Sequence, residues 1–109
     1  MFGVFAPDQR RYPRVTPPKS ALAAWQAGPR RDVSFLESLS VGGLFVRTKQ
    51  ALPVRSLVQL LLDLPVGQVR CLGIVRRARE NHGIAVQFTA MDASDRARLF
   101  QQVKSLLAT

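Results

Sequence analysis

The stretch SLSVGGLFVRT, residues 38–48, combines a polar glycine corner with an alternating run of side chains. Over residues 44–48 the even-numbered side chains are expected on one side of the chain and the odd-numbered ones on the other, as in a half-buried strand. Gly42 and Gly43 permit positive φ and the close approach of a ligand or another strand. The pattern predicts a glycine turn between two strands, and it leaves open whether that turn also contacts a ligand.

A second informative stretch is RRYPR, residues 10–14, which precedes the first by some twenty-odd residues. An Arg-x-x-x-Arg element followed by an Asp/Asn-x-Ser-x-x-Gly turn that enters a strand resembles the PilZ domain family. Arg10 and Arg14 match the two arginines, and Ser40 and Gly43 match the serine and the glycine. Ser38 departs from the pattern, because the family usually has Asp or Asn at this place.

The resemblance extends over nearly the whole chain, through a later strand that contains arginines and the Gly-x-x-Val-x-Phe pattern of residues 83–88. It implies a mostly β fold, a small six-stranded antiparallel barrel with a C-terminal α-helix. It also implies a bacterial signalling protein that binds cyclic di-GMP and needs no cofactor. The ligand-binding residues that it implies are Arg10, Arg11, Arg14, Ser38, Ser40 and Gly43.

These residue types suit the ligand that the resemblance implies. Cyclic di-GMP carries two guanines and two phosphodiester anions, and arginine can donate a matched pair of hydrogen bonds to guanine and charged bonds to phosphate. Ser40 offers a hydroxyl, and Gly43 leaves room for the backbone to meet the ligand. Ser38 offers one rotatable hydroxyl in place of a carboxylate or carboxamide, so it is expected to be the weakest member of the site.

The composition indicates one basic globular domain. The chain has 109 residues with a hydrophobic content of 47%, which suits one core. Its formal charge is +9, from 16 basic and 7 acidic residues, and 13 of the basic residues are arginines. Such a surface attracts polyanions in general, so nucleotides, nucleic acids and acidic membranes all remain possible partners.

Several kinds of site are disfavoured by the sequence. No apolar run approaches the ~20 residues that span a bilayer, and no secretory signal is visible, so a cytoplasmic protein is expected. Cys71 lies in an apolar strand pattern and is expected to be a buried structural thiol. His82 is predicted to be a polar turn residue without a catalytic or metal-binding partner. We therefore expect no enzymatic activity and no metal site.

The hydrophobic periodicity predicts strands followed by one helix. Residues 1–9 are predicted to be a flexible tail before a single domain at 10–109, with Trp25 in the core or at its rim. The strand from Leu57 to Leu64 should bury its even-numbered residues, and a helix should begin at Asp92 as N-cap. The remaining predicted strands are 21–26, 33–39, 44–48, 69–79 and 84–88, with turns at 29–32, 65–68 and 81–83, and the helix face consists of Leu99, Phe100, Val103, Leu106 and Leu107.

These observations lead to one functional hypothesis and two alternatives. The hypothesis is a cyclic di-GMP-binding effector that signals through a protein partner, because 109 residues leave no room for a separate output domain. The first alternative, favoured by Ser38, is a PilZ-like interaction adaptor that does not bind the nucleotide. The second, favoured by the charge, is a basic β-barrel that binds nucleic acid. The few aromatic residues are not interleaved with basic ones, which argues against a stacking platform for single strands.

Overall fold

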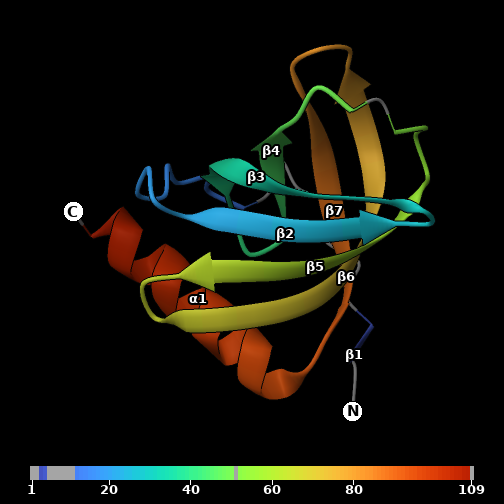
Figure 1. The fold of residues 1–109 in the computed structure, drawn as a ribbon. Helices are drawn as coiled ribbons and strands as arrows, with labels where there is room; N and C mark the ends of the chain where they lie inside the picture. The colour runs from blue at the N-terminus through green and yellow to red at the C-terminus, as the bar shows by residue number, and fades with distance from the viewer. Residues whose placement is uncertain (1–2, 5–11, 51, 109) are drawn as a thin grey trace.

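The computed structural model describes residues 3–4, 12–50 and 52–108. Within these residues the chain forms seven strands and one helix (Figure 1). The elements are β1 (Gly3–Val4), β2 (Leu22–Ala27), β3 (Arg30–Leu39), β4 (Gly43–Arg47), β5 (Leu57–Leu64), β6 (Gly67–Arg79), β7 (Gly83–Met91) and α1 (Ala93–Leu107).

The sheet closes on itself as an antiparallel barrel. Its strand order is β7-β4-β3-β2-β5-β6, and β6 pairs back with β7, so that six strands of the described chain complete the circle. β1 adds to β7 beside Ala90 and Met91. Closure leaves these strands without a free edge and sends alternate side chains into the barrel. The predicted six-stranded barrel with a C-terminal helix is therefore confirmed.

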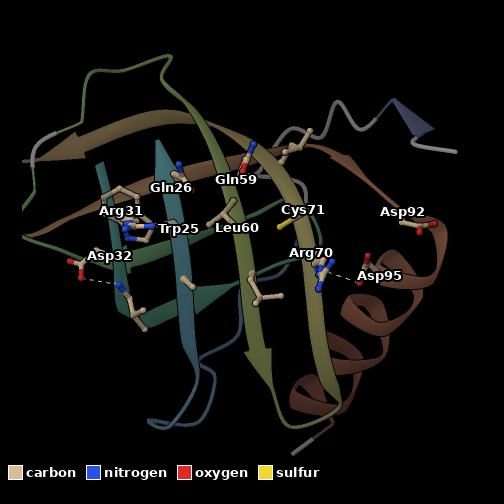
Figure 2. Close-up of a pocket in the computed structure, with 14 residues that line it drawn as sticks. Trp25, Gln26, Arg31, Asp32, Gln59, Leu60, Arg70, Cys71, Asp92 and Asp95 are labelled. Carbon is tan, nitrogen blue, oxygen red and sulfur yellow. Dashed lines mark hydrogen bonds between the residues drawn. The ribbon is translucent and has the colours of Figure 1, made fainter. Parts of the chain in front are cut away.

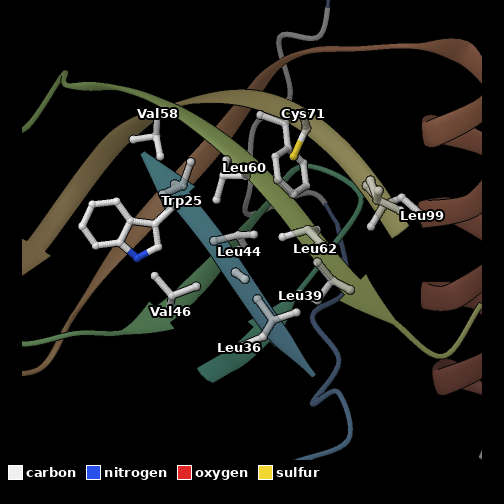
Figure 3. Packing of buried hydrophobic residues seen from close by; sticks show 14 of the residues in the cluster. Trp25, Leu36, Leu39, Leu44, Val46, Val58, Leu60, Leu62, Cys71 and Leu99 are labelled. Carbon is white, nitrogen blue, oxygen red and sulfur yellow. The ribbon is translucent and has the colours of Figure 1, made fainter. Parts of the chain in front are cut away.

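The core consists of the inward side chains of the barrel (Figure 3). On β5 the predicted inward set, the even-numbered residues from Val58 to Leu64, is buried. Trp25 is 2% exposed, and its indole nitrogen donates a 2.9 Å hydrogen bond to the buried Ser34 hydroxyl. The Cys71 side chain is buried as expected. Both the period-2 pattern and the prediction of Trp25 as a core residue are confirmed.

Two predicted turns are shorter than the sequence indicated. The turn predicted at 29–32 is only Gly28–Pro29, and residues 30–32 already belong to β3. Gly28 has φ +59, which the first position of a II′ hairpin turn requires, while the fixed φ of proline suits the second position. The connection predicted at 65–68 is likewise a two-residue turn, Pro65–Val66. The charged residues 30–32 form strand hydrogen bonds next to the tight turn, and their hydrophobicity pattern does not predict this.

The helix α1 packs beside β6 and covers one end of the barrel (Figure 1). Leu99 and Val103 enter the core, and Gln102 accepts a 3.2 Å bond from the backbone N–H of Val66. Phe100 and Leu107, which were predicted on the packed face, are 58% and 50% exposed. Phe100 lies about 100° around the helix from Leu99, and Leu107 is the last residue of α1, beyond the turn that packs on the barrel. Asp92 occupies the N-cap position as predicted, but its side chain makes no capping hydrogen bond.

Of the predicted tail at 1–9, the structure describes only Gly3–Val4, which pair with β7 as β1. The other residues of that segment lie outside the described residues.

Gly73 is expected to be required for packing where β6 crosses the core. A Cβ at this position would contact Cγ1 of Val86 and lie 2.9 Å from the backbone oxygen of Gln87. Gly73→Ala should therefore lower the free energy of unfolding by about 1–3 kcal/mol, the usual cost of overpacking a core. Urea denaturation measures this change, and an unchanged midpoint would show that the barrel yields there without strain.

Candidate functional site

A β-bulge in β3 decides which way Ser38 points. The ladder between β3 and β4 pairs Leu36 with Val46 and then Ser38 with Phe45, so Glu37 is an inserted residue. Inward positions before the bulge are even-numbered, whereas after it Leu39 is buried in the core. The inserted residue therefore turns Ser38 to the outside of the barrel, where it is half-buried.

Ser38 belongs to a row of outward side chains that crosses four strands. Ser38 of β3 pairs with Phe45 of β4, Phe45 pairs with Ala85 of β7, and Ala85 pairs with Arg77 of β6. A second bulge, with Arg76 inserted between the pairs of Val75 and Arg77, aims Arg77 outward. The small Ala85 in the middle of the row leaves a hollow between Ser38 and Arg77.

Arg14 reaches the same row from the other predicted element. Val15 and Leu39 form an isolated bridge with hydrogen bonds of 2.8 and 3.0 Å, which holds the segment of Arg14 against the end of β3. The Arg14 guanidinium donates a 2.9 Å hydrogen bond from Nη1 to the hydroxyl of Ser38. The structure thus brings together two predicted site residues that are 24 positions apart.

The residues of this row line a pocket with a volume of about 600 Å³, within the range of small-molecule sites. Among the described residues its lining is Arg14, Glu37, Ser38, Phe45, Val54, Arg76, Arg77, Ala78, Arg79, His82 and Ala85. The one acidic side chain of this lining, Glu37, forms a 3.2 Å ion pair with Arg47. The pocket is therefore strongly basic, and its half-buried Phe45 ring lies 5.8 Å from the ring of His82.

The electrostatics of the pocket follow from this crowding of arginines. Partial burial lowers the pKa of Arg14, and the neighbouring charge of Arg77 lowers it further. Burial and the charge of Arg77 both disfavour the protonated form of Arg14, and an anion bound beside the two guanidinium groups would stabilise that form. The arrangement is thus suited to a ligand with negative charge and polar edges.

Ser40 and the two glycines form a closed corner beside the pocket. The Ser40 side chain is fully buried, and its hydroxyl accepts 3.1 Å hydrogen bonds from the N–H groups of both Gly42 and Gly43. The Ser40 N–H donates to the Gly43 carbonyl at 2.9 Å. Ser40 and Gly43 are not among the residues that line the pocket. In this structure the corner fixes the end of β3 and the start of β4.

The corner does not use the positive φ that Gly42 and Gly43 permit. Among the described glycines positive φ occurs at Gly28 and Gly67. At the corner a side-chain hydroxyl, rather than a left-handed backbone, satisfies the N–H groups of the turn. Of the other predicted site residues, Arg10 and Arg11 lie outside the described residues.

Sequence reasoning missed several residues of the pocket. Arg76, Arg77 and Arg79 were seen only as part of a later arginine-containing strand, and His82 only as a turn residue. A usable signal existed, because the apolar alternation of β6 stops after Val75 while the strand continues to Arg79. Three arginines within four residues of one strand indicate a surface that attracts anions.

Other site types find little support. Among the described residues no group of His, Cys, Asp and Glu side chains could hold a metal ion. Burial, and then the charge of Asp95, raise the pKa of the Cys71 thiol, so it is a poor nucleophile. In the described part of the chain, no helix combines the length and the apolar character that crossing a membrane demands.

Comparison with known proteins agrees with this fold. A family model described as PilZ domain matches residues 8–105. No curated protein matches the sequence. Among solved structures, the K. pneumonia MrkH–c-di-GMP complex is similar over 94% of this chain and 54% of that chain, with a TM-score of 0.78 and 18% identity.

Two further structures show the same fold. The Bacillus subtilis inhibitor of motility (MotI/DgrA) matches 92% of this chain and 52% of that chain, with a TM-score of 0.73 and 19% identity. The PilZ domain of Escherichia coli YcgR, with c-di-GMP, matches 93% of both chains, with a TM-score of 0.61 and 16% identity. The chain therefore spans about half the length of the MrkH and MotI chains.

The corner hydroxyl is expected to matter more for stability than the pocket hydroxyl. Ser40→Ala leaves the N–H groups of Gly42 and Gly43 without their buried acceptor, which should cost about 1–3 kcal/mol of unfolding free energy. The control Ser38→Ala removes a half-buried hydroxyl and should change it by less than about 0.5 kcal/mol. Urea denaturation of both variants gives the comparison, and equal losses would contradict the structural role of Ser40.

Proposed function

Because the chain belongs to the PilZ domain family, we propose that it binds cyclic di-GMP in the basic pocket and passes the signal to a protein partner. The hydrogen bond between Arg14 and Ser38 carries the proposal, since it joins the two sequence elements at one pocket. The similar MrkH and YcgR structures, which hold c-di-GMP, support the choice of ligand.

In the proposed complex the arginines recognise both parts of the ligand. Arg14 and Arg77 both line the pocket and repel each other, and a phosphodiester bound there would offset this repulsion. Guanidinium groups also match the O6 and N7 edge of guanine, and Phe45 offers an apolar surface on the floor of the pocket. Arg10 and Arg11 are proposed to contact the ligand from the segment that precedes Arg14. Ser40 and Gly43 contribute through the corner that holds Ser38 in place.

In this proposal the protein is a binding module and not an enzyme. Among the described lining residues arginines dominate, the carboxylate of Glu37 is paired with Arg47, and the His82 ring packs beside Phe45, so the pocket is suited to holding an anion. Binding is proposed to act through the ordering of the arginine segment and through the surface that the complex presents to a partner.

Loss of either arginine of the Arg-x-x-x-Arg element should weaken nucleotide binding. We expect Arg10→Ala and Arg14→Ala each to raise the Kd for cyclic di-GMP at least about tenfold, because a charge-assisted bond contributes about 1.5–3 kcal/mol. The melting temperature should change little. Lysine at position 14 should restore little affinity, because a point charge lacks the guanidinium fork. Isothermal titration calorimetry measures all four proteins, and unaltered affinity in both alanine variants would refute the site.

A matched control separates pocket binding from general attraction to a basic surface. Ala85→Leu fills the hollow between Ser38 and Arg77 without changing the charge, so it should weaken cyclic di-GMP binding as strongly as Arg14→Ala does. The affinity for duplex DNA, in contrast, depends on neutralising phosphate charge, so it should fall steeply with added salt. Ala85→Leu should leave the DNA affinity unchanged. If DNA binds more tightly than cyclic di-GMP at physiological salt, the nucleic-acid alternative suggested by the +9 charge holds instead.

Substitution of Ser38 tests the one departure from the family pattern. Ser38→Asn supplies a carboxamide without charge and should tighten cyclic di-GMP binding by about 1 kcal/mol, one good hydrogen bond. Ser38→Asp should gain less, because its carboxylate would pair with Arg14 and cancel charge that the ligand needs.

The same titrations decide between the receptor and the adaptor. Tightening from measurable binding supports a working receptor that Ser38 has weakened. Binding that appears only in a variant shows an adaptor that has lost its ligand. If both substitutions weaken a strong native interaction, Ser38 is well fitted to the ligand and is not a weak point.

A further inference from the structure

The outer face of β3, β2, β5 and β6 carries most of the exposed large apolar side chains of the described residues. Val33 is 59% exposed, Phe35 60%, Leu57 74% and Leu72 40%. The strand registers place these residues around Ala24 and Leu61 on one side of the sheet. We call this surface the apolar face; it consists of Leu22, Ala24, Val33, Phe35, Leu57, Leu61, Leu72 and Ile74.

The apolar face is hollowed and lies apart from the proposed nucleotide site. A depression of about 790 Å³ extends over β2 and β5, between Arg31 on one side and Arg70 with Asp95 on the other (Figure 2). The polar pair Gln26 and Gln59 lies within this surface, between Leu57 and Leu61 of β5. A cluster of exposed apolar side chains with a few polar groups among them is typical of a protein interface. We propose that the apolar face binds the same face of a second copy of this chain, as a two-fold symmetric dimer.

The charges of the apolar face favour a second copy over an acidic partner. On and around this face Arg31, Arg70 and Arg98 are offset by Asp32, Asp63, Asp92 and Asp95, and Asp95 is paired with Arg98 at 3.1 Å. An acidic partner would prefer the arginine-rich pocket on the other side of β3. A nearly neutral face is the part of a +9 chain where two copies meet with little repulsion.

The positions of two charges give the dimer its geometry. Ala24 pairs with Val33 on one side and Leu61 on the other, and it is the centre of the face. Arg31 lies one strand away toward one end of the sheet, and Asp63 lies one strand away in the opposite direction toward the other end. At usual strand spacings their Cα atoms are about 16 Å apart, too far for a pair within one chain.

A two-fold axis makes these two charges complementary. An axis in the plane of contact, passing through Ala24 and perpendicular to the line from Arg31 to Asp63, places each Arg31 opposite Asp63 of the second copy. The strands of the two copies then cross steeply, near the orthogonal mode of sheet packing. The face is four strands wide and about seven residues long along each strand, which gives an area of about 20 by 24 Å. A contact of this area falls in the size class of weak, reversible dimers.

Charge reversal tests the dimer on the full chain without nucleotide. Sedimentation over a concentration series should approach twice the 12.1 kDa mass of one chain. Arg31→Glu and Asp63→Arg should each raise the dimer Kd by about tenfold or more, because like charges then face each other twice. The double variant should return to within about threefold of the original value, since the pairs re-form with exchanged signs.

Two controls keep this result independent of the nucleotide proposal. Lys104→Glu changes the charge as much as Arg31→Glu does, but it lies on the exposed side of α1 and should leave dimerisation unchanged. Arg14→Ala should weaken cyclic di-GMP binding at least about tenfold and leave the dimer intact. A monomer at all concentrations, or single and double reversals with equal effects, would overturn the proposed dimer, whatever the nucleotide does.

Discussion

The insertion of Glu37 into β3 is the constraint from which the site follows. A closed barrel must bury alternate side chains, and a strand without a bulge would send Ser38 inward after Ser34 and Leu36. The inserted residue reverses the alternation at low cost, because Leu39 then fills the core where its bridge to Val15 is formed. One local irregularity thus exposes Ser38, anchors the segment of Arg14 and brings the two residues within hydrogen-bond distance.

Ser38 affects the charge of the pocket as well as its hydrogen bonds. A carboxylate at this position would pair with Arg14 and offset part of the repulsion between Arg14 and Arg77. The serine hydroxyl accepts the bond from Arg14 but leaves the positive charge uncancelled. The departure from the family pattern therefore removes a strong polar contact and keeps more charge for an anion. The net effect on affinity is the difference between these two terms, each of about 1–3 kcal/mol.

The sequence predicted those features that depend on local pattern. Alternation on β5 identified the inward set from Val58 to Leu64. The family resemblance, rather than a local pattern, assigned Arg14 and Ser38 to one site, and the structure joins them by a hydrogen bond. The arginines at the end of β6 are visible in the sequence, but the directions of Arg76 and Arg77 could not be predicted, because they depend on a bulge whose position only the pairing with β7 reveals. The same holds for Ser40, which looks like a ligand-binding hydroxyl in sequence. Its burial becomes evident only once the corner closes on its own N–H groups.

The strand β3 connects the proposed nucleotide site with the proposed dimer contact. Before the bulge its outward side chains, Val33 and Phe35, belong to the apolar face, and after it Ser38 belongs to the pocket. Phe35 also pairs across the ladder with Arg47, the ion-pair partner of Glu37. Since two anionic phosphates reduce the net charge of each copy, ligand binding and self-association should favour one another through electrostatics alone.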